Sequence, residues 1–191
     1  NGGNGGPGIV VVKSTNGLLV SGPSANTVTF DGTNFVASFK ASGDLTFGCA
    51  AAADGFIQVD YLAVGGGGGG GSQGGGGGGA GGFRTSFPGG TKAFLSPGPN
   101  VITIGSGGGG SPGPGPSPGG SSGTASGLGG TFAAGGGKGG TNNPSATGFA
   151  GGSGGGVKEP FDPRNMDKSV IKTQQMVLFW ISLIETHKLV S

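Results

Sequence analysis

Glycine dominates the centre of this chain and is missing from its end. Residues 65–156 contain 42 glycines in 92 positions, whereas the last 35 residues contain none. Because glycine has no side chain to bury and loses the most backbone entropy on folding, the central stretch cannot build a conventional hydrophobic core. It must be held by backbone hydrogen bonds or remain loose.

The residues that precede the glycine stretch predict strands. Residues 9–12 form a β-branched run typical of a buried strand, and a short apolar strand follows at 18–20. Apolar residues then alternate with other residues over four segments separated by turn signals such as Asp31-Gly32: 27–30, 35–39, 45–49 and 57–64. Short strands at this spacing predict an antiparallel sheet folded as a small β-sandwich.

Two conformations are open for the glycine-rich region that follows. Its composition is typical of a flexible linker or of irregular loops. The alternative is polyglycine II, an extended helix with the three-residue turn of polyproline II, in which neighbouring helices bond through their backbones where no Cβ intervenes. Four prolines between 112 and 118 favour the φ value of this conformation. We also expect a short hairpin near residues 92–104, in which 92–95 pairs with 101–104.

The glycine-free end predicts a helix. Asp162-Pro163 is a helix-start signal, and apolar residues follow at helical spacing: Met166, Val170, Val177, Ile181 and Ile184. The expected fold class is therefore mainly β, with a small antiparallel β-sandwich, a glycine-rich region and a C-terminal amphipathic helix. That helix either packs on the sheet or on a copy of itself, or forms a weak coiled coil.

Charge and residue types argue against several functions. The formal charge is only +2, and the lysines and arginines form no basic stripe, which disfavours nucleic-acid binding. The chain has one His and one Cys, Cys49, and its carboxylates stand at no metal-ligand or paired catalytic spacing. Its longest apolar neighbourhood, 176–184, is about half the length of a membrane span. We expect no enzyme activity, cofactor, metal, nucleic-acid partner or membrane span.

Aromatic and cationic residues of the glycine-rich region are the candidates for a binding surface. Each phenylalanine either pins glycine segments together or is an exposed apolar contact, and pinning is favoured because exposed apolar patches are uncommon without a partner. The candidate ligand-contact residues are Phe83, Arg84, Phe87, Lys92, Phe94, Phe132, Lys138 and Phe149.

The order of segments resembles a known family. A strand at 60–64 is followed by glycine runs at 65–71 and 74–79, then Gly-Gly-Phe-Arg at 81–84, a short strand at 101–104 and further glycine. This order resembles the glycine-rich domain of bacteriophage tail fibre and adhesin-type proteins, which also occurs in many marine viral and bacterial proteins. Residues 5–13 resemble the strand that closes such a domain, so the resemblance covers about 1–156.

The resemblance implies a domain organisation. Residues 1–13 are then the closing strand of a preceding glycine-rich repeat, 14–64 a small β-sheet module, 65–156 a glycine-rich domain and 157–191 an atypical helical tail. Two features depart from the family: no closing Gly-Ile-Val-Val strand follows Gly156, and the tail does not resemble the family.

The resemblance also implies a function. Related phage adhesins pack polyglycine II helices and touch a host receptor with surface loops. We therefore expect a structural, receptor-binding segment of a phage tail fibre or similar surface fibre, located on the virion or extracellularly. Its partners are a host cell-surface receptor, either a glycan or an outer-membrane protein, and other fibre subunits, including copies of itself. The alternative is a secreted or cell-wall glycine-rich structural protein without a specific receptor.

Overall fold

The computed structural model of the chain describes residues 1–48, 55–72, 75–113, 119–141 and 148–156. These residues all belong to one compact unit, Asn1–Lys158, whereas a second unit, Glu159–Ser191, lies outside them. The predicted C-terminal helix and Cys49 also fall outside the described residues.

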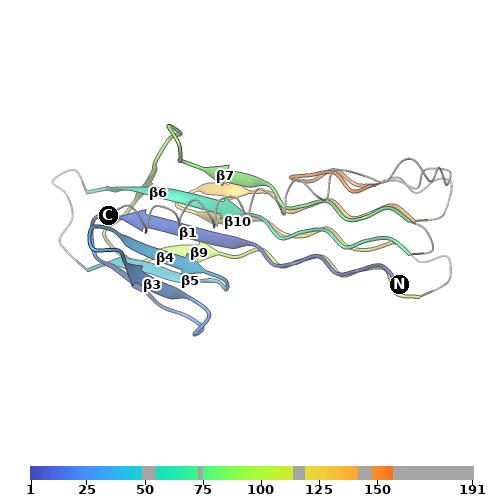
Figure 1. The fold of residues 1–191 in the computed structure, drawn as a ribbon, viewed down its shortest axis with the longest axis horizontal. Helices are drawn as coiled ribbons and strands as arrows, with labels where there is room; N and C mark the ends of the chain where they lie inside the picture. The colour runs from blue at the N-terminus through green and yellow to red at the C-terminus, as the bar shows by residue number, and fades with distance from the viewer. Residues whose placement is uncertain (49–54, 73–74, 114–118, 142–147, 157–191) are drawn as a thin grey trace. The chain divides into compact units, whose positions relative to one another are not determined.

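The described residues form two antiparallel sheets (Figure 1). The first has the order β3-β4-β1-β6-β7, with β8 also pairing with β6. Its strands are β1 (Ile9–Ser14), β3 (Thr27–Phe30), β4 (Phe35–Phe39), β6 (Ile57–Val64), β7 (Phe83–Thr85) and β8 (Ala93–Leu95). The second sheet has the order β11-β10-β9-β5-β2. Its strands are β2 (Leu18–Val20), β5 (Gly43–Phe47), β9 (Asn100–Thr103), β10 (Ser126–Leu128) and β11 (Thr131–Ala133).

Both sheets contribute to one hydrophobic core. In β1 the alternate residues Val10 and Val12 are fully buried, and Val10 lies opposite Phe39 of β4 and Ala63 of β6. Leu45, Ile102 and Leu128 of the second sheet belong to the same buried cluster. Burying a Val, Leu or Phe side chain stabilises a fold by about 1.5–3 kcal/mol, so this cluster is the main apolar support of the unit. The mainly β prediction is confirmed.

An aspartate closes the hairpin between β3 and β4. The Asp31 carboxylate accepts hydrogen bonds from the backbone amides of Asn34 at 2.7 Å and Thr33 at 2.9 Å, and Gly32 adopts a φ of 96°. This is the turn that Asp31-Gly32 predicts, since a residue with positive φ is best supplied by glycine. The bonds from Asn34 and Thr33 lower the pKa of Asp31 below its ordinary value.

The expected hairpin near 92–104 does not form between its two strands. β8 pairs with β6, so that Leu95 lies opposite Ile57, whereas β9 pairs with β5 and β10. The Asn100 side chain holds the connection by donating to the carbonyls of Ser96 and Gly98, both at 2.8 Å. Because β8 pairs in the first sheet and β9 in the second, the connection between them passes from one sheet to the other.

A further hairpin lies where the composition suggested only linker or glycine helix. β10 and β11 pair across Gly129 and Gly130, which have φ values of 51° and 82°. Two consecutive residues with positive φ define the tight turn that suits a two-residue hairpin, and Gly-Gly is one of its preferred sequences. Leu128 of this hairpin is buried in the core.

Most glycines lie in extended segments that continue from the strands. In Figure 1 these segments run side by side away from the labelled strands, and the segment at the N-terminus leads directly into β1. We call them together the glycine bundle. Its members among the described residues are 1–8, 65–71, 75–82, 105–111, 119–124, 134–141 and 148–156.

The segments bond to one another at every third residue. Segment 1–8 donates from Gly2, Gly5 and Gly8 to segment 105–111. Segment 75–82 donates to 134–141 with the same spacing, from residues 76, 79 and 82. A chain with three residues per turn places such donors on one line, which is the pattern expected of packed glycine helices.

Segment 65–71 is the centre of the bundle. All seven of its amides donate to other segments at 2.8–3.0 Å, and they reach three partners in rotation: 75–82, 119–124 and 1–8. Its carbonyls accept from two more segments, 105–111 and 134–141. Five neighbours thus surround one glycine strand, and backbone hydrogen bonds take over the role that side chains have in the core.

The glycines of this region are required by close packing. A Cβ added at Gly68 would overlap the carbonyl oxygen of Gly137, and one at Gly69 would overlap that of Gly109. A Cβ at Gly67 would instead lie 3.5 Å from its nearest neighbour, the nitrogen of Gly6, which is an ordinary contact.

The N-terminal residues are integral to this unit. β1 lies between β4 and β6, and the preceding segment bonds to 65–71 and 105–111. Residues 1–13, which the resemblance assigns to a preceding repeat, therefore share both the sheet and the bundle with the residues that follow.

Replacing adjacent glycines of the central segment tests the packing. Gly68→Ala should destabilise the unit by about 3 kcal/mol, the upper range for overpacking, because the methyl group meets backbone. Gly67→Ala should leave stability unchanged or raise it by up to about 1 kcal/mol, since it only restricts the unfolded chain. Urea unfolding followed by circular dichroism measures both, and equal losses would contradict this packing.

Titration of Asp31 tests the turn between β3 and β4. The pKa of its carboxyl, measured by NMR in the folded protein, should lie below the ordinary value of 3.8. Because the folded pKa is the lower one, the turn gains stability above the unfolded pKa and loses it as pH falls through the folded pKa. Asp31→Asn should remove this pH dependence, and a pKa at or above 3.8 would contradict the hydrogen bonds.

Candidate functional surface

The five candidate phenylalanines lie on the surface. Each exposes about half of its area: 46% for Phe83, 53% for Phe87, 55% for Phe94, 57% for Phe132 and 52% for Phe149. None is enclosed between glycine segments, so the pinning interpretation is wrong for these residues. The bundle is held by its backbone and leaves its aromatic side chains to solvent.

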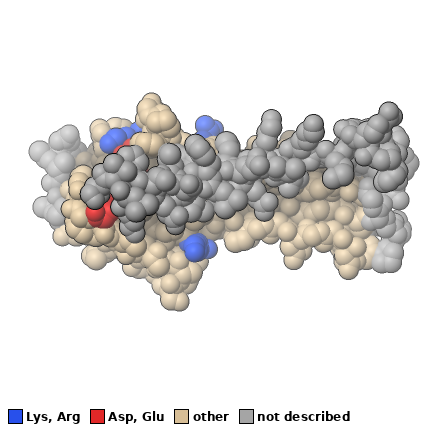
Figure 2. Space-filling view, in the orientation of Figure 1, with Lys and Arg blue, Asp and Glu red and all other residues tan. Residues whose placement is uncertain are grey.

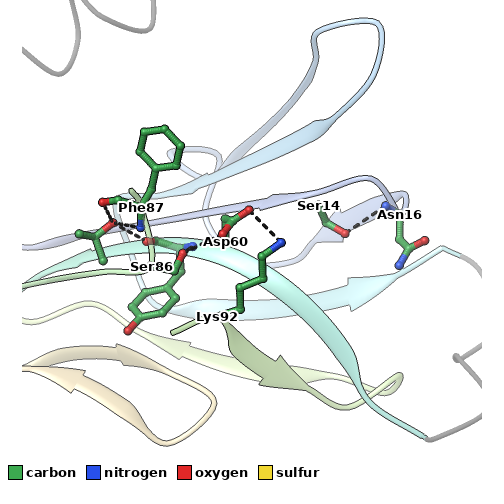
Figure 3. Close-up of polar contacts among 8 residues, drawn as sticks. Ser14, Asn16, Asp60, Ser86, Phe87 and Lys92 are labelled. Carbon is green, nitrogen blue, oxygen red and sulfur yellow. Dashed lines mark hydrogen bonds and ion pairs between the residues drawn. The ribbon is translucent and has the colours of Figure 1, made fainter. Parts of the chain in front are cut away.

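A buried serine fixes the loop that carries Phe87. Ser86 is 3% exposed, and its hydroxyl donates to the Asp60 carboxylate at 3.0 Å while accepting from the Tyr61 amide at 2.9 Å (Figure 3). Its own amide donates to the Tyr61 carbonyl at 3.1 Å. These bonds join the end of β7 to β6, because Asp60 and Tyr61 are residues of β6.

The same carboxylate binds the other end of the loop. Lys92 forms an ion pair with Asp60 at 3.4 Å, and Figure 3 shows the lysine reaching the aspartate beside Ser86. Lys92 is therefore engaged within the protein. The loop from 86 to 92 is held at both ends by one residue of β6, which restricts where Phe87 projects.

A third hydrogen bond orients Phe87 directly. The Phe87 amide donates to the Thr85 hydroxyl at 3.0 Å, and that hydroxyl donates to the Tyr61 carbonyl at 3.0 Å. The backbone of an exposed aromatic residue is thus ordered by its neighbours, as a preformed contact residue requires.

Phe83, Arg84 and Phe132 come from edge strands. β7 ends the first sheet and β11 ends the second, and the two strands contact each other. At this junction Gly82 donates to the Ala134 carbonyl at 2.6 Å. The ring of Phe132 covers Gly127 on β10 so closely that a Cβ there would overlap it. The two edges therefore present aromatic and cationic side chains near one junction.

Lys138 and Phe149 form a pair within the glycine bundle. The Lys138 Nζ lies 4.3 Å from the centre of the Phe149 ring, which is a cation–π geometry. The backbones also bond, because the Phe149 amide donates to the Lys138 carbonyl at 3.1 Å. The pair joins segments 134–141 and 148–156, so the structure brings together two residues that are distant in sequence.

The charges that can be seen on one face of the described surface do not form a patch. In the face shown in Figure 2, the lysine and arginine side chains stand apart from one another. Among the described residues, no group of three or more His, Cys, Asp or Glu side chains is placed to hold a metal ion. Within the same residues, no helix is long and apolar enough to cross a membrane.

Sequence reasoning missed the residues that position the surface. Neither Asp60 nor Ser86 is among the residues predicted from the sequence to form the surface, yet the two anchor the loop from 86 to 92. The alternation along β6 does place Asp60 off the core face, but its pairing with a loop 26 residues later depends on the β6–β7 register.

The fold and the surface together define a β-protein whose sheets continue into hydrogen-bonded glycine segments and whose aromatic residues face outward. The family model for the glycine-rich domain matches residues 41–167, well over half of the chain. The chain therefore belongs to the glycine-rich domain family. No curated protein and no solved structure matches the chain at a significant level.

The two polar contacts that hold the loop from 86 to 92 should contribute unequally to stability. Ser86→Ala should cost about 1–3 kcal/mol of stability, because it removes the buried hydroxyl that bonds both the Tyr61 amide and the Asp60 carboxylate. Lys92→Ala should cost about 1 kcal/mol or less, since its ion pair is largely exposed. Thermal unfolding of both variants is the measurement, and a larger loss for Lys92→Ala would contradict the arrangement.

Proposed function

We propose that this protein is a structural and receptor-binding segment of a phage tail fibre or a similar surface fibre, located on a virion or extracellularly. The observation that carries the proposal is the set of half-exposed phenylalanines on ordered backbone. Exposed aromatic residues of this kind are enriched where proteins contact partners.

The glycine bundle supports a mechanical role in this proposal. We take its segments to be packed polyglycine II helices, because the hydrogen bonds repeat every third residue and run between segments. Such a bundle needs few side chains for its own stability. Its surface residues are then free to vary with the ligand, which is a host cell-surface glycan or outer-membrane protein.

The contact surface would be built from two groups of the candidate residues. Phe87 and Phe94 lie beside β6, with Lys92 positioning the loop between them. Phe83, Arg84 and Phe132 lie at the β7–β11 junction, and the Lys138–Phe149 pair extends the set along the bundle. In this proposal the protein acts by binding alone.

The second candidate is a secreted or cell-wall glycine-rich structural protein without a specific receptor. The extent of backbone hydrogen bonding in the bundle supports this candidate as well as the first, since such bonding serves a purely structural role equally well. The two candidates differ in whether binding to cells saturates.

Binding to intact bacterial cells tests the proposal. The fluorescently labelled chain is titrated onto a panel of bacteria and bound fluorescence is measured by flow cytometry. We expect saturable binding to at least one strain and its loss in the triple variant Phe83→Ser, Phe87→Ser and Phe94→Ser. Removing these side chains should cost affinity without unfolding the protein, because all three are exposed.

The matched control is Phe30→Ser. Phe30 is 56% exposed and lies on β3, at the opposite edge of the first sheet from β7. It should bind as the unchanged chain does. Non-saturating binding to every strain would favour the structural protein, and saturable binding that survives the triple substitution would exclude these phenylalanines as the contact surface.

A further inference from the structure

One side of the central glycine segment, 65–71, has no neighbour among the residues that the structure describes. With three residues per turn, carbonyls three residues apart lie on one line along segment 65–71. Two of the three lines accept hydrogen bonds from other segments, those of residues 66 and 69 and of residues 67 and 70. On the third line, no described residue donates a backbone hydrogen bond to Gly65, Gly68 or Gly71.

The solvent exposure of segment 65–71 also repeats every three residues. Gly67 and Gly70 are half-buried, whereas the glycines between and before them, at 65, 66, 68 and 69, are buried. A strand surrounded on all sides would show no such repeat. Among the described residues, the five neighbours therefore leave a sixth position open beside the segment.

The open position lies between segments 1–8 and 75–82. On one wall, a Cβ added at Gly67 would lie 3.5 Å from the Gly6 nitrogen, and a Cβ added at Gly70 would lie 3.5 Å from the Gly3 nitrogen. On the other wall, Gly78 and Gly81 pack against the carbonyls of Gly68 and Gly65. We call this position the glycine groove.

The walls carry unused donors that match the unused acceptors. The amides of Gly3, Gly6, Gly78 and Gly81 donate to no described residue. The glycine groove thus offers amides from two walls and carbonyls from its floor, at three-residue spacing. Only a chain with three residues per turn can bond to all of them.

The groove also excludes most side chains from whatever occupies it. Elsewhere in the bundle, positions that face a neighbouring segment cannot carry a Cβ. This applies to one position in three of segment 1–8, at Gly2, Gly5 and Gly8, and to two in three of segment 65–71. An occupant therefore needs glycine at one or two of every three positions. Residues 157–191 contain no glycine and cannot supply this pattern.

We propose that the glycine groove binds an extended glycine-rich segment of a second copy of this chain. Segment 1–8 fits best, since it has the required glycine pattern and bonds to only two other segments in its own copy. The bonds formed would repeat those between segments within one copy. This proposal concerns assembly and does not depend on the proposed function.

Sedimentation of the full 191-residue chain over a concentration series tests the proposal. The chain should associate as its concentration rises. The double variant Gly67→Ala and Gly70→Ala places two methyl groups in the groove, which should weaken association by about tenfold or more through steric exclusion. Both substitutions make only ordinary contacts within one copy, so circular dichroism should show an unchanged fold.

Gly77→Ala is the matched control. A Cβ at Gly77 meets nothing within 4 Å, and the Gly77 carbonyl accepts from Gly156 of segment 148–156, away from the groove. This variant should associate as the unchanged chain does. A chain that stays monomeric at every concentration, or a double variant that associates equally well, would overturn the proposal.

Hydrogen exchange gives a second, residue-specific readout. The amides of Gly3, Gly6, Gly78 and Gly81 should exchange rapidly in the monomer and slow down on association. The bonded amides of Gly2 and Gly5 should be slow in both states, as an internal reference. Slow exchange of the four groove amides in the monomer would show that the chain covers its own groove, which would also overturn the proposal.

Discussion

The structure depends on backbone approaching backbone with no side chain between. In the glycine bundle, amide and carbonyl groups of neighbouring segments meet at 2.6–3.1 Å, and a single methyl group at most inward positions would separate them. Each bond adds only about 0.5–1.5 kcal/mol net, so stability comes from the number of bonds formed together. Glycine is costly in entropy, and this dense bonding is what offsets that cost.

The sheets fix the register of the glycine bundle, and the bundle extends the hydrogen bonding of the short strands. A glycine segment alone has no preferred register, because its residues are alike and it has no apolar face. Each strand, in contrast, has a register fixed by which side chains reach the core, as Val10 opposite Phe39 and Ala63 illustrates. Since β1, β6 and β7 run directly into or out of glycine segments, the register of the sheet sets which carbonyl each glycine meets. The short strands gain in return a long hydrogen-bonded extension.

The sequence predicted the parts of the fold that side chains determine. The bounds of β6 follow from the alternation that begins at Ile57, and the β3–β4 turn follows from Asp31-Gly32, whose conformational needs are local. The pairing of β8 was mispredicted, because the closeness of 92–95 to 101–104 in the sequence does not reveal that β8 pairs with β6 and β9 with β5 and β10. β10 and β11 were missed because a single Leu128 in glycine-rich surroundings resembles linker. The outward placement of Phe83 and Phe132 could not be derived either, since it depends on which strands end the two sheets.

The three-residue repeat of the bundle has a consequence for how such a protein changes length. Inserting one or two residues into a glycine segment rotates every later residue onto a different line and breaks all the lateral bonds beyond that point. Inserting three residues restores the lines and moves the end of the segment outward by about 9 Å. If two segments that are joined by a loop at the end away from the sheets each lengthen by three residues, the loop moves further from the sheets. Every existing contact is kept. The bundle can therefore grow in discrete steps without any change to the β-sheets that support it.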